Sequence, residues 1–202
     1  MADFEGAYQL VHSQLQALDK NLFYHNIGHT FEDVLPTAIM LAKEEGLNED
    51  DILLVKTAAL FHDTGYLDQY PKNEPKGCER VRQYLPQFGY SEDQIEKICK
   101  CIMATMVPQN PGDCRLCQIL CDADLGHLGT DLYFLKSECL RLELERVHKK
   151  PITPRDWHIS NLDFLQKHHY FTNAAKKIMQ PVKEQNYKLN ECLVYGHSNN
   201  NK

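Results

Sequence analysis

Apolar residues recur along the chain with the three- and four-residue spacing of helices, and the alternation typical of strands is almost absent. An apolar stripe over 10–18 predicts an opening helix, and a second helical segment runs over 29–46 and ends at a glycine, a common helix C-terminal residue. Pro36 lies inside this segment and is expected to kink it. The pattern therefore predicts an all-α protein, a single-domain helical bundle.

Polar residues that can cap helices mark where the next helices begin. Asn48 precedes three acids and is a good N-cap for a helix towards His62, because acids are favoured in a first turn. Ser91 and Gln94 have the spacing of a capping box before a helix rich in isoleucine. Further helices are expected over 116–125 and 132–147, and after the capping residues Thr153 and Thr172.

Two segments depart from the helical pattern. Residues 65–77 contain two prolines and are expected to form a loop at the rim of a pocket, with helix resuming near Cys78. From Tyr187 onward polar residues replace the apolar pattern, so 187–202 are expected to form a loosely ordered tail. No repeat or linker divides the remainder, which predicts one domain over 1–186.

Composition narrows the classes of protein that the chain can belong to. Its 202 residues, 43% of them hydrophobic, are enough for a core that needs no disulfides. A net charge of −6 argues against a nucleic-acid platform, although a small anionic substrate stays compatible with it. The N-terminus has no apolar signal segment and no apolar run is long enough to span a membrane. We therefore expect a soluble, cytoplasmic protein with no membrane partner, whose oligomeric state the sequence leaves open.

Eight cysteines without an export signal are expected to be reduced thiols rather than a disulfide framework. Cys114 and Cys117 form a C-x-x-C motif, and Cys99, Cys101 and Cys121 are near in sequence, so a structural zinc or redox site is an open alternative. Because Cys117 and Cys121 are one helical turn apart beside apolar residues, the favoured interpretation is that they are small buried core residues.

The candidate chemistry starts at the adjacent pair His62 and Asp63. The pair follows the apolar run 58–61 and precedes a break at 64–65, which puts two ionisable groups at the buried end of a helix. Burial of such groups is costly unless a charge compensates it, and a divalent cation would do so. Further polar groups occur upstream at His25 and His29, and downstream at two aspartates in an apolar helix, Asp122 and Asp124.

Three motifs, YHNIGHT (24–30), FHDTGY (61–66) and CDADLGHLG (121–129), resemble those of the HD-domain superfamily of metal-dependent phosphohydrolases, in particular its small stand-alone members. The resemblance covers residues 23–131 and implies an all-helical hydrolase. It implies a metal site made of His29, His62, Asp63 and Asp124, with Asp122 as the rival for the last position. Ligands of these types suit manganese, iron, cobalt, nickel, zinc or magnesium.

The resemblance also implies roles for other residues. The YHN-x-x-H stretch is similar to that of cyclic-nucleotide phosphodiesterases, which makes His25 a candidate general acid and Asp63 a candidate for orienting the attacking water. Candidates for binding the substrate are three cations near the rim and one aromatic residue: Lys72, Lys76, Arg80 and Tyr66. By contrast, His127 is expected to have a structural role, and surface positions are expected for His158, His168 and His169. A solvated helix end is expected for the charged run Glu143, Glu145, Arg146, Lys149 and Lys150.

One departure from the family pattern limits the reaction. Many relatives have a further histidine shortly after the His-Asp pair, but none occurs here between His62 and His127, where Asn73 and Glu74 are the alternatives. A single metal is therefore favoured over two. The expected substrate is a phosphate ester of a nucleotide or related small metabolite. The alternatives are a cyclic-nucleotide phosphodiesterase, a non-catalytic nucleotide-binding regulatory module and, with least support, an iron oxygenase.

Overall fold

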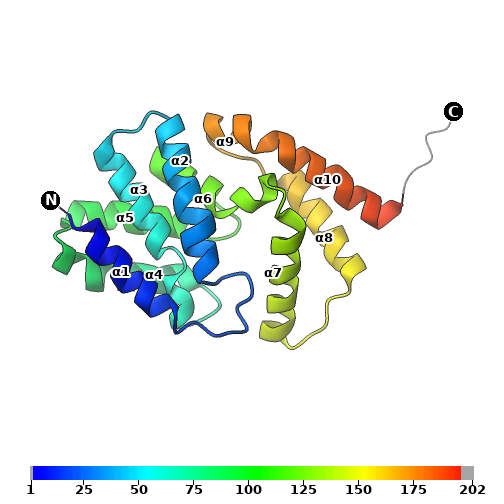
Figure 1. Cartoon of the computed structure of the whole chain (residues 1–202), viewed down its shortest axis with the longest axis horizontal. Helices are drawn as coiled ribbons and strands as arrows, with labels where there is room; N and C mark the ends of the chain where they lie inside the picture. Colours follow the sequence, from blue (N-terminus) through cyan, green and yellow to red (C-terminus); the bar gives the residue numbers. More distant parts are fainter. Residues whose placement is uncertain (1, 197–202) are drawn as a thin grey trace.

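The computed structural model of the chain describes residues 2–196, which form helices and connecting turns without a strand (Figure 1). This confirms the all-α fold. The α-helices are α1 (Phe4–Leu15), α2 (Leu35–Glu44), α3 (Glu49–Phe61), α4 (Asn73–Tyr84), α5 (Glu92–Ala104), α6 (Arg115–Asp124), α7 (Tyr133–His148), α8 (Pro154–Lys167), α9 (Asn173–Ile178) and α10 (Gln180–Tyr195). A π-helical segment (His29–Val34) leads into α2, and three short 3-10 turns complete the chain: Thr64–Leu67, Leu85–Phe88 and Gly126–Gly129.

Helix starts follow the capping residues that the sequence contains. The Asn48 side chain accepts a hydrogen bond from the Asp51 amide, and Ser91 with Gln94 makes a complete capping box. Thr153 and Thr172 cap α8 and α9 in the same way. These caps satisfy amides that have no partner within the helix, so the local sequence is sufficient to fix where these helices begin.

Two expectations about irregular segments are corrected. Helix α4 begins at Asn73, five positions before the expected Cys78, because Pro75 lies in its first turn, where a proline costs no hydrogen bond. Pro36 lies in the first turn of α2, directly after the π-helical segment. Residues 187–195 belong to α10, where Asn190 is buried and its side chain bonds His158 twice. Residues 197–202 of the expected tail lie outside the described residues.

Buried side chains form two apolar groups. The larger group joins α1 to α6 with α9 and includes the fully buried Phe61. The smaller consists of Leu128, Tyr133 and Leu165, which connect the turn after α6 to α7 and α8. Figure 1 shows α7, α8 and α10 beside the group that α1 to α6 form. The functional site lies where the two groups meet.

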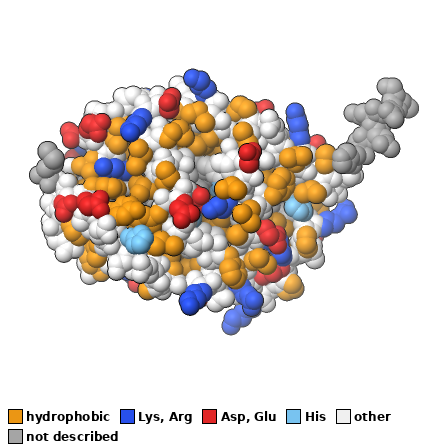
Figure 2. Space-filling model, in the orientation of Figure 1, with side chains coloured by type: hydrophobic (Ala, Val, Ile, Leu, Met, Phe, Trp, Pro, Cys, Tyr) orange, Lys and Arg blue, Asp and Glu red, His pale blue; other side chains and the backbone are white. Residues whose placement is uncertain are grey.

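Acidic and basic side chains are scattered over the face drawn in Figure 2, among apolar side chains, and no continuous basic tract occurs on that face. Within the described part of the chain, no helix combines the length and the apolar character that crossing a bilayer demands.

Candidate metal centre and pocket

Four side chains that are distant in sequence converge in the core, and we call them the His–Asp cluster: His29, His62, Asp63 and Asp124. The His29 Nε2 atom lies 3.3 Å from Asp124 Oδ1 and 3.6 Å from Asp63 Oδ2. The His62 Nε2 atom lies 3.2 Å from Asp63 Oδ2 and 3.5 Å from Asp124 Oδ1. Both imidazoles are 1% exposed, so the cluster is closed to bulk solvent on the histidine side.

Local turns bring these side chains to one point. The Asn26 side chain accepts hydrogen bonds from the amides of Gly28 and His29, which fixes the start of the π-helical segment. Segments of this type are frequent at functional sites. After the His-Asp pair, Gly65 packs so closely on the start of α4 that a Cβ atom there would lie 1.9 Å from the Asn73 carbonyl oxygen. A glycine is therefore required for the turn that carries Asp63.

The Nδ1 atom of each imidazole faces an oxygen atom outside the cluster, so the Nε2 atom is the one directed at the cluster. His62 Nδ1 donates to the Ala59 carbonyl over 2.7 Å, which assigns the free lone pair to Nε2. His29 Nδ1 faces Asp33 Oδ2 at 3.7 Å, and Asp33 also pairs with Lys136. This is the arrangement by which proteins orient metal-binding histidines.

The two carboxylates of the cluster create a strong demand for positive charge. Burial opposes protonation of His62, but Asp63 and Asp124 outweigh it and raise the pKa of His62 well above its usual value. Burial likewise opposes ionisation of Asp124, but the adjacent imidazoles of His29 and His62 lower its pKa. His62 Nε2 and Asp63 Oδ2 are buried without a hydrogen-bond partner. Ligand atoms of His29, His62 and Asp124 lie within 4.8 Å of one another, and Asp63 Oδ2 lies beside both imidazoles. Such a set of nitrogen and oxygen donors could hold a divalent cation.

Asp122, the rival for the last ligand position, is occupied elsewhere. This fully buried carboxylate accepts hydrogen bonds from the Phe171 amide (2.8 Å), the Thr172 amide (2.8 Å) and the Thr172 hydroxyl (2.7 Å). It thereby ties the start of α9 to α6. Asp124, two positions further along, is the aspartate that reaches His29 and His62.

Glu143 is a functional candidate that the sequence analysis missed. The expected solvated side chain is in fact 0% exposed, and it accepts hydrogen bonds from the amides of Tyr24 (2.8 Å) and His25 (3.0 Å) and from the Tyr70 hydroxyl (2.9 Å). It also hydrogen-bonds the Nδ1 atom of His25. The sequence did contain a sign that Glu143 is buried. Position 143 falls three residues after Leu140, which puts both on the face of α7 that faces the interior.

Comparison with known proteins defines the family. A family model described as HD domain matches residues 26–127, half of the chain, and this range contains the whole His–Asp cluster. The chain belongs to the HD-domain family. No curated protein matches it. Among solved structures, a predicted HD superfamily hydrolase from an uncultured Thermotogales bacterium is similar in fold, with a TM-score of 0.63 and 18% identity over 94% of this chain and 90% of that chain.

Beside the cluster of the HD domain lies a cavity of about 640 Å³, which we call the pocket. Asp124 and His25 contribute to its inner end, and Tyr66 and Lys72 also line it. The opposite wall comes from α7 and α8, after the range that the family model matches, and consists largely of apolar and aromatic side chains: Tyr133, Leu140, Leu144, Trp157 and Phe164.

Two of the expected phosphate-binding cations do not reach the pocket. Lys76 pairs with Glu79 on the surface of α4 at 2.7 Å. The Arg80 guanidinium pairs with Asp68 at 3.1 Å and donates to Gln14 at 2.7 Å, which ties α4 to α1. The early start of α4 explains both positions, because these residues lie on the helix surface rather than in a rim loop. We exclude them from the candidate site.

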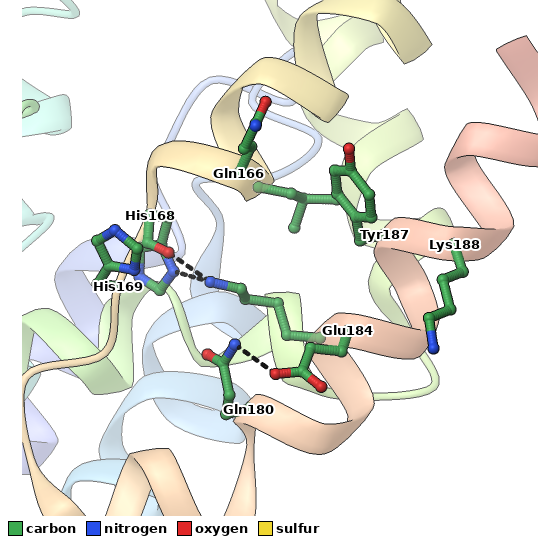
Figure 3. A pocket seen from close by; sticks show the side chains of 9 residues that line it. Gln166, His168, His169, Gln180, Glu184, Tyr187 and Lys188 are labelled. Carbon is green, nitrogen blue, oxygen red and sulfur yellow. Dashed lines mark hydrogen bonds between the residues drawn. The ribbon is translucent and has the colours of Figure 1, made fainter.

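A separate hollow of about 420 Å³ lies between the end of α8 and α10 (Figure 3). Lys183 donates to the His168 carbonyl oxygen and lies 3.1 Å from His168 Nδ1. Burial, followed by the nearby Lys183 charge, lowers the pKa of His168 to about 3, so this half-buried histidine is neutral. Gln180 and Glu184 bond each other across one turn at 3.0 Å. His168 Nε2 has no hydrogen-bond partner, and His169 is exposed as expected.

The two aspartates of α6 are expected to respond oppositely to replacement by alanine. Asp122→Ala leaves the amides and hydroxyl at the start of α9 without an acceptor, and we expect it to lower the free energy of unfolding by about 3 kcal/mol. Its metal content should equal that of the wild type. Asp124→Ala should lose the metal with a smaller effect on stability. Chemical denaturation and metal analysis check this, and metal loss from a folded Asp122→Ala protein would contradict it.

Proposed function

We propose that the chain is a metal-dependent phosphohydrolase that cleaves a phosphate ester of a nucleotide or a related small metabolite. The observation that carries the proposal is the pair of buried, unpartnered atoms, His62 Nε2 and Asp63 Oδ2, beside His29 and Asp124 at the inner end of a pocket. Membership of the HD-domain family indicates a metal-dependent hydrolase and supports this assignment.

The four residues of the His–Asp cluster would hold one divalent cation. When bound, such a cation supplies Lewis acidity towards a phosphoryl oxygen and lowers the pKa of water, which yields a nucleophile at neutral pH. The carboxylates are themselves held in place: Asp63 Oδ1 accepts from Asn73 Nδ2 at 3.4 Å, and Asp124 Oδ2 accepts from Gln109 Nε2 at 3.3 Å. Asp63 is therefore positioned to orient the attacking water.

His25 is the proposed general acid. Glu143 holds its Nδ1, which leaves Nε2 to protonate the leaving oxygen, and the ring stands 4.4 Å from that of Tyr66 in the pocket wall. Burial opposes ionisation of Glu143, but the hydrogen bond with His25 outweighs it and lowers the pKa of Glu143, so this carboxylate is charged and orients the His25 ring. Glu143 acts through His25 and is a positioning residue.

The pocket also limits the substrate. Lys72 is its one lining residue of the lysine or arginine type, so the charge balance suits a single phosphoryl group rather than a triphosphate. The apolar wall from α7 and α8 suits a flat or apolar body, as a nucleoside has. Within this wall the Ser137 hydroxyl accepts hydrogen bonds from Trp157 Nε1 and Asn161 Nδ2, both at 2.8 Å, which fixes the indole against the cavity.

A cyclic-nucleotide phosphodiesterase is the second candidate, and the oriented His25 favours it, because opening a cyclic ester also requires a protonated leaving oxygen. Comparing linear monophosphates with cyclic esters on the same preparation separates the two activities. Phosphate release from monophosphates alone supports the first proposal.

The His–Asp cluster is tested by the variant Asp63→Ala. We expect loss of bound metal and of phosphate release, with unchanged helical circular dichroism, because a ligand and not a core contact is removed. The exposed Asp68, five positions later, provides the matched control Asp68→Ala, which should keep both metal and activity. Turnover by Asp63→Ala at the wild-type rate would overturn the assignment.

The His25 and Glu143 pair is tested by Glu143→Gln, which keeps the size of the side chain and removes its charge. We expect kcat to fall by about 10²-fold, with metal content unchanged. The loss should shrink for an ester whose leaving group is a good one, because such a group needs no proton. Glu145→Gln, two positions along α7, is the control. An equal loss for both leaving groups would mean that Glu143 is only structural.

The contribution of Lys72 is tested by Lys72→Asn. Lys72 has a left-handed backbone conformation (φ 57°), held by hydrogen bonds from Gln69 Nε2 to the carbonyl oxygens of Pro71 and Lys72, both at 2.8 Å. Asparagine tolerates this conformation, so the variant removes the charge without straining the turn. We expect KM for a monophosphate to rise about tenfold at unchanged thermal stability. A KM equal to that of the wild type would exclude the contact.

A further inference from the structure

A second group of metal-ligating side chains lies outside the proposed active site, and we call it the thiol cluster: Cys101, Cys114 and Cys117. Cys101 lies on α5, Cys114 is the residue before α6, and Cys117 lies in the first turn of α6. The Cys117 Sγ atom is 2.7 Å from that of Cys114 and 3.4 Å from that of Cys101, and all three sulfurs lie within 4.8 Å of one another. Helices α5 and α6 pack against each other, so the cluster spans a helix–helix contact.

Packing of small apolar residues does not explain this arrangement. Buried thiols of the same two helices are directed at backbone carbonyl oxygens: Cys99 at that of Cys78 (3.7 Å) and Cys121 at that of Ala104 (3.2 Å). The thiols of the cluster face one another instead. Non-bonded carbon atoms are most stable about 3.5–4.0 Å apart and sulfur is larger than carbon, so these sulfurs are closer than apolar neighbours would be.

The dimensions and the chemistry fit a thiophilic cation. A zinc–sulfur distance of about 2.3 Å in a tetrahedral site puts sulfurs about 3.8 Å apart. The half-exposed Cys114 can open the cluster to this size by a side-chain rotation, since the other two thiols are 1% and 0% exposed and fixed by packing.

We propose that Cys101, Cys114 and Cys117 bind a zinc ion that clamps α5 to the start of α6. Zinc binding releases the protons of the thiols that bind it. Cys114 is half-exposed, so the fourth coordination position of the zinc ion is left to solvent. A redox pair would need two cysteines, whereas the third thiol, Cys101, comes from another helix. The site is distinct from the His–Asp cluster, because Asp124 lies at the other end of α6, about 15 Å away at 1.5 Å per residue.

Cobalt titration of the reduced protein tests the proposal, because only cobalt bound to thiolates gives an intense near-ultraviolet charge-transfer band. We expect this band in the wild type and in Asp63→Ala, and its displacement by zinc. Cys114→Ser and Cys117→Ser should weaken cobalt binding at this site by more than about 100-fold, the upper end of what loss of an outer partner of a metal costs. Cys121→Ser, on the same helix, should keep the band.

A second measurement guards against a folding defect. In the Asp63→Ala background, zinc should raise the thermal midpoint, and the added Cys114→Ser change at a half-exposed position should abolish that rise. No band at saturating cobalt, a band retained in both Cys114→Ser and Cys117→Ser, or a Cys114–Cys117 disulfide that persists in the zinc-loaded, mildly reduced protein would overturn the proposal.

Discussion

Two carboxylates facing two imidazoles in the core impose the constraint on which the rest of the structure depends. Asp63 and Asp124 lie within 3.2–3.6 Å of the imidazole nitrogens, in surroundings where unbalanced charge is costly. Three elements must meet for this: the π-helical segment, the end of α3 and the end of α6. The glycine turn at Gly65, the Asn26 turn and the Asp122 tether each fix one of these ends. These three contacts therefore hold the side chains of the His–Asp cluster close together.

Glu143 extends this constraint to the part of the chain beyond the family match. Its carboxylate on α7 accepts hydrogen bonds from the backbone amides of Tyr24 and His25 and bonds the His25 ring, so the smaller apolar group is anchored to the segment that leads into His29. The range that the family model matches, 26–127, contains the residues of the His–Asp cluster. Helices α7 and α8 form the opposite wall of the pocket. The matched range therefore contains the His–Asp cluster, whereas Glu143 and the apolar wall of the pocket come from the helices that follow it.

The sequence predicted those features whose cause is local. Caps such as Asn48 and Ser91 act on amides three residues away, and the helical period is visible in any short window. The convergence of His29, His62, Asp63 and Asp124 was expected from a resemblance to a family, because spacing alone does not bring distant segments together. The helical state of 187–195 and the burial of Glu143 depend on tertiary contacts, and polar composition was misleading for both. The start of α4 was expected too late because prolines were taken to mark a loop, although a proline is compatible with a first helical turn. Whether Asp122 or Asp124 faces the cluster depends on one helical rotation, which the α9 tether decides.

Helix α6 connects the two proposed metal sites and shows how one chain can keep two cations apart. The first turn of α6 carries the Cys117 thiol, which lies in the contact with α5. The last residue of α6, Asp124, places a carboxylate oxygen beside the imidazole nitrogens of His29 and His62. Soft thiolates favour thiophilic ions, whereas mixed nitrogen and oxygen ligands accept a broader range of divalent metals, so the two proposed sites would differ in metal preference. Since α6 is only three turns long, a clamp at its start also restrains the helix that carries Asp124. The thiol cluster would in this way stabilise the geometry of the catalytic metal site without contacting it.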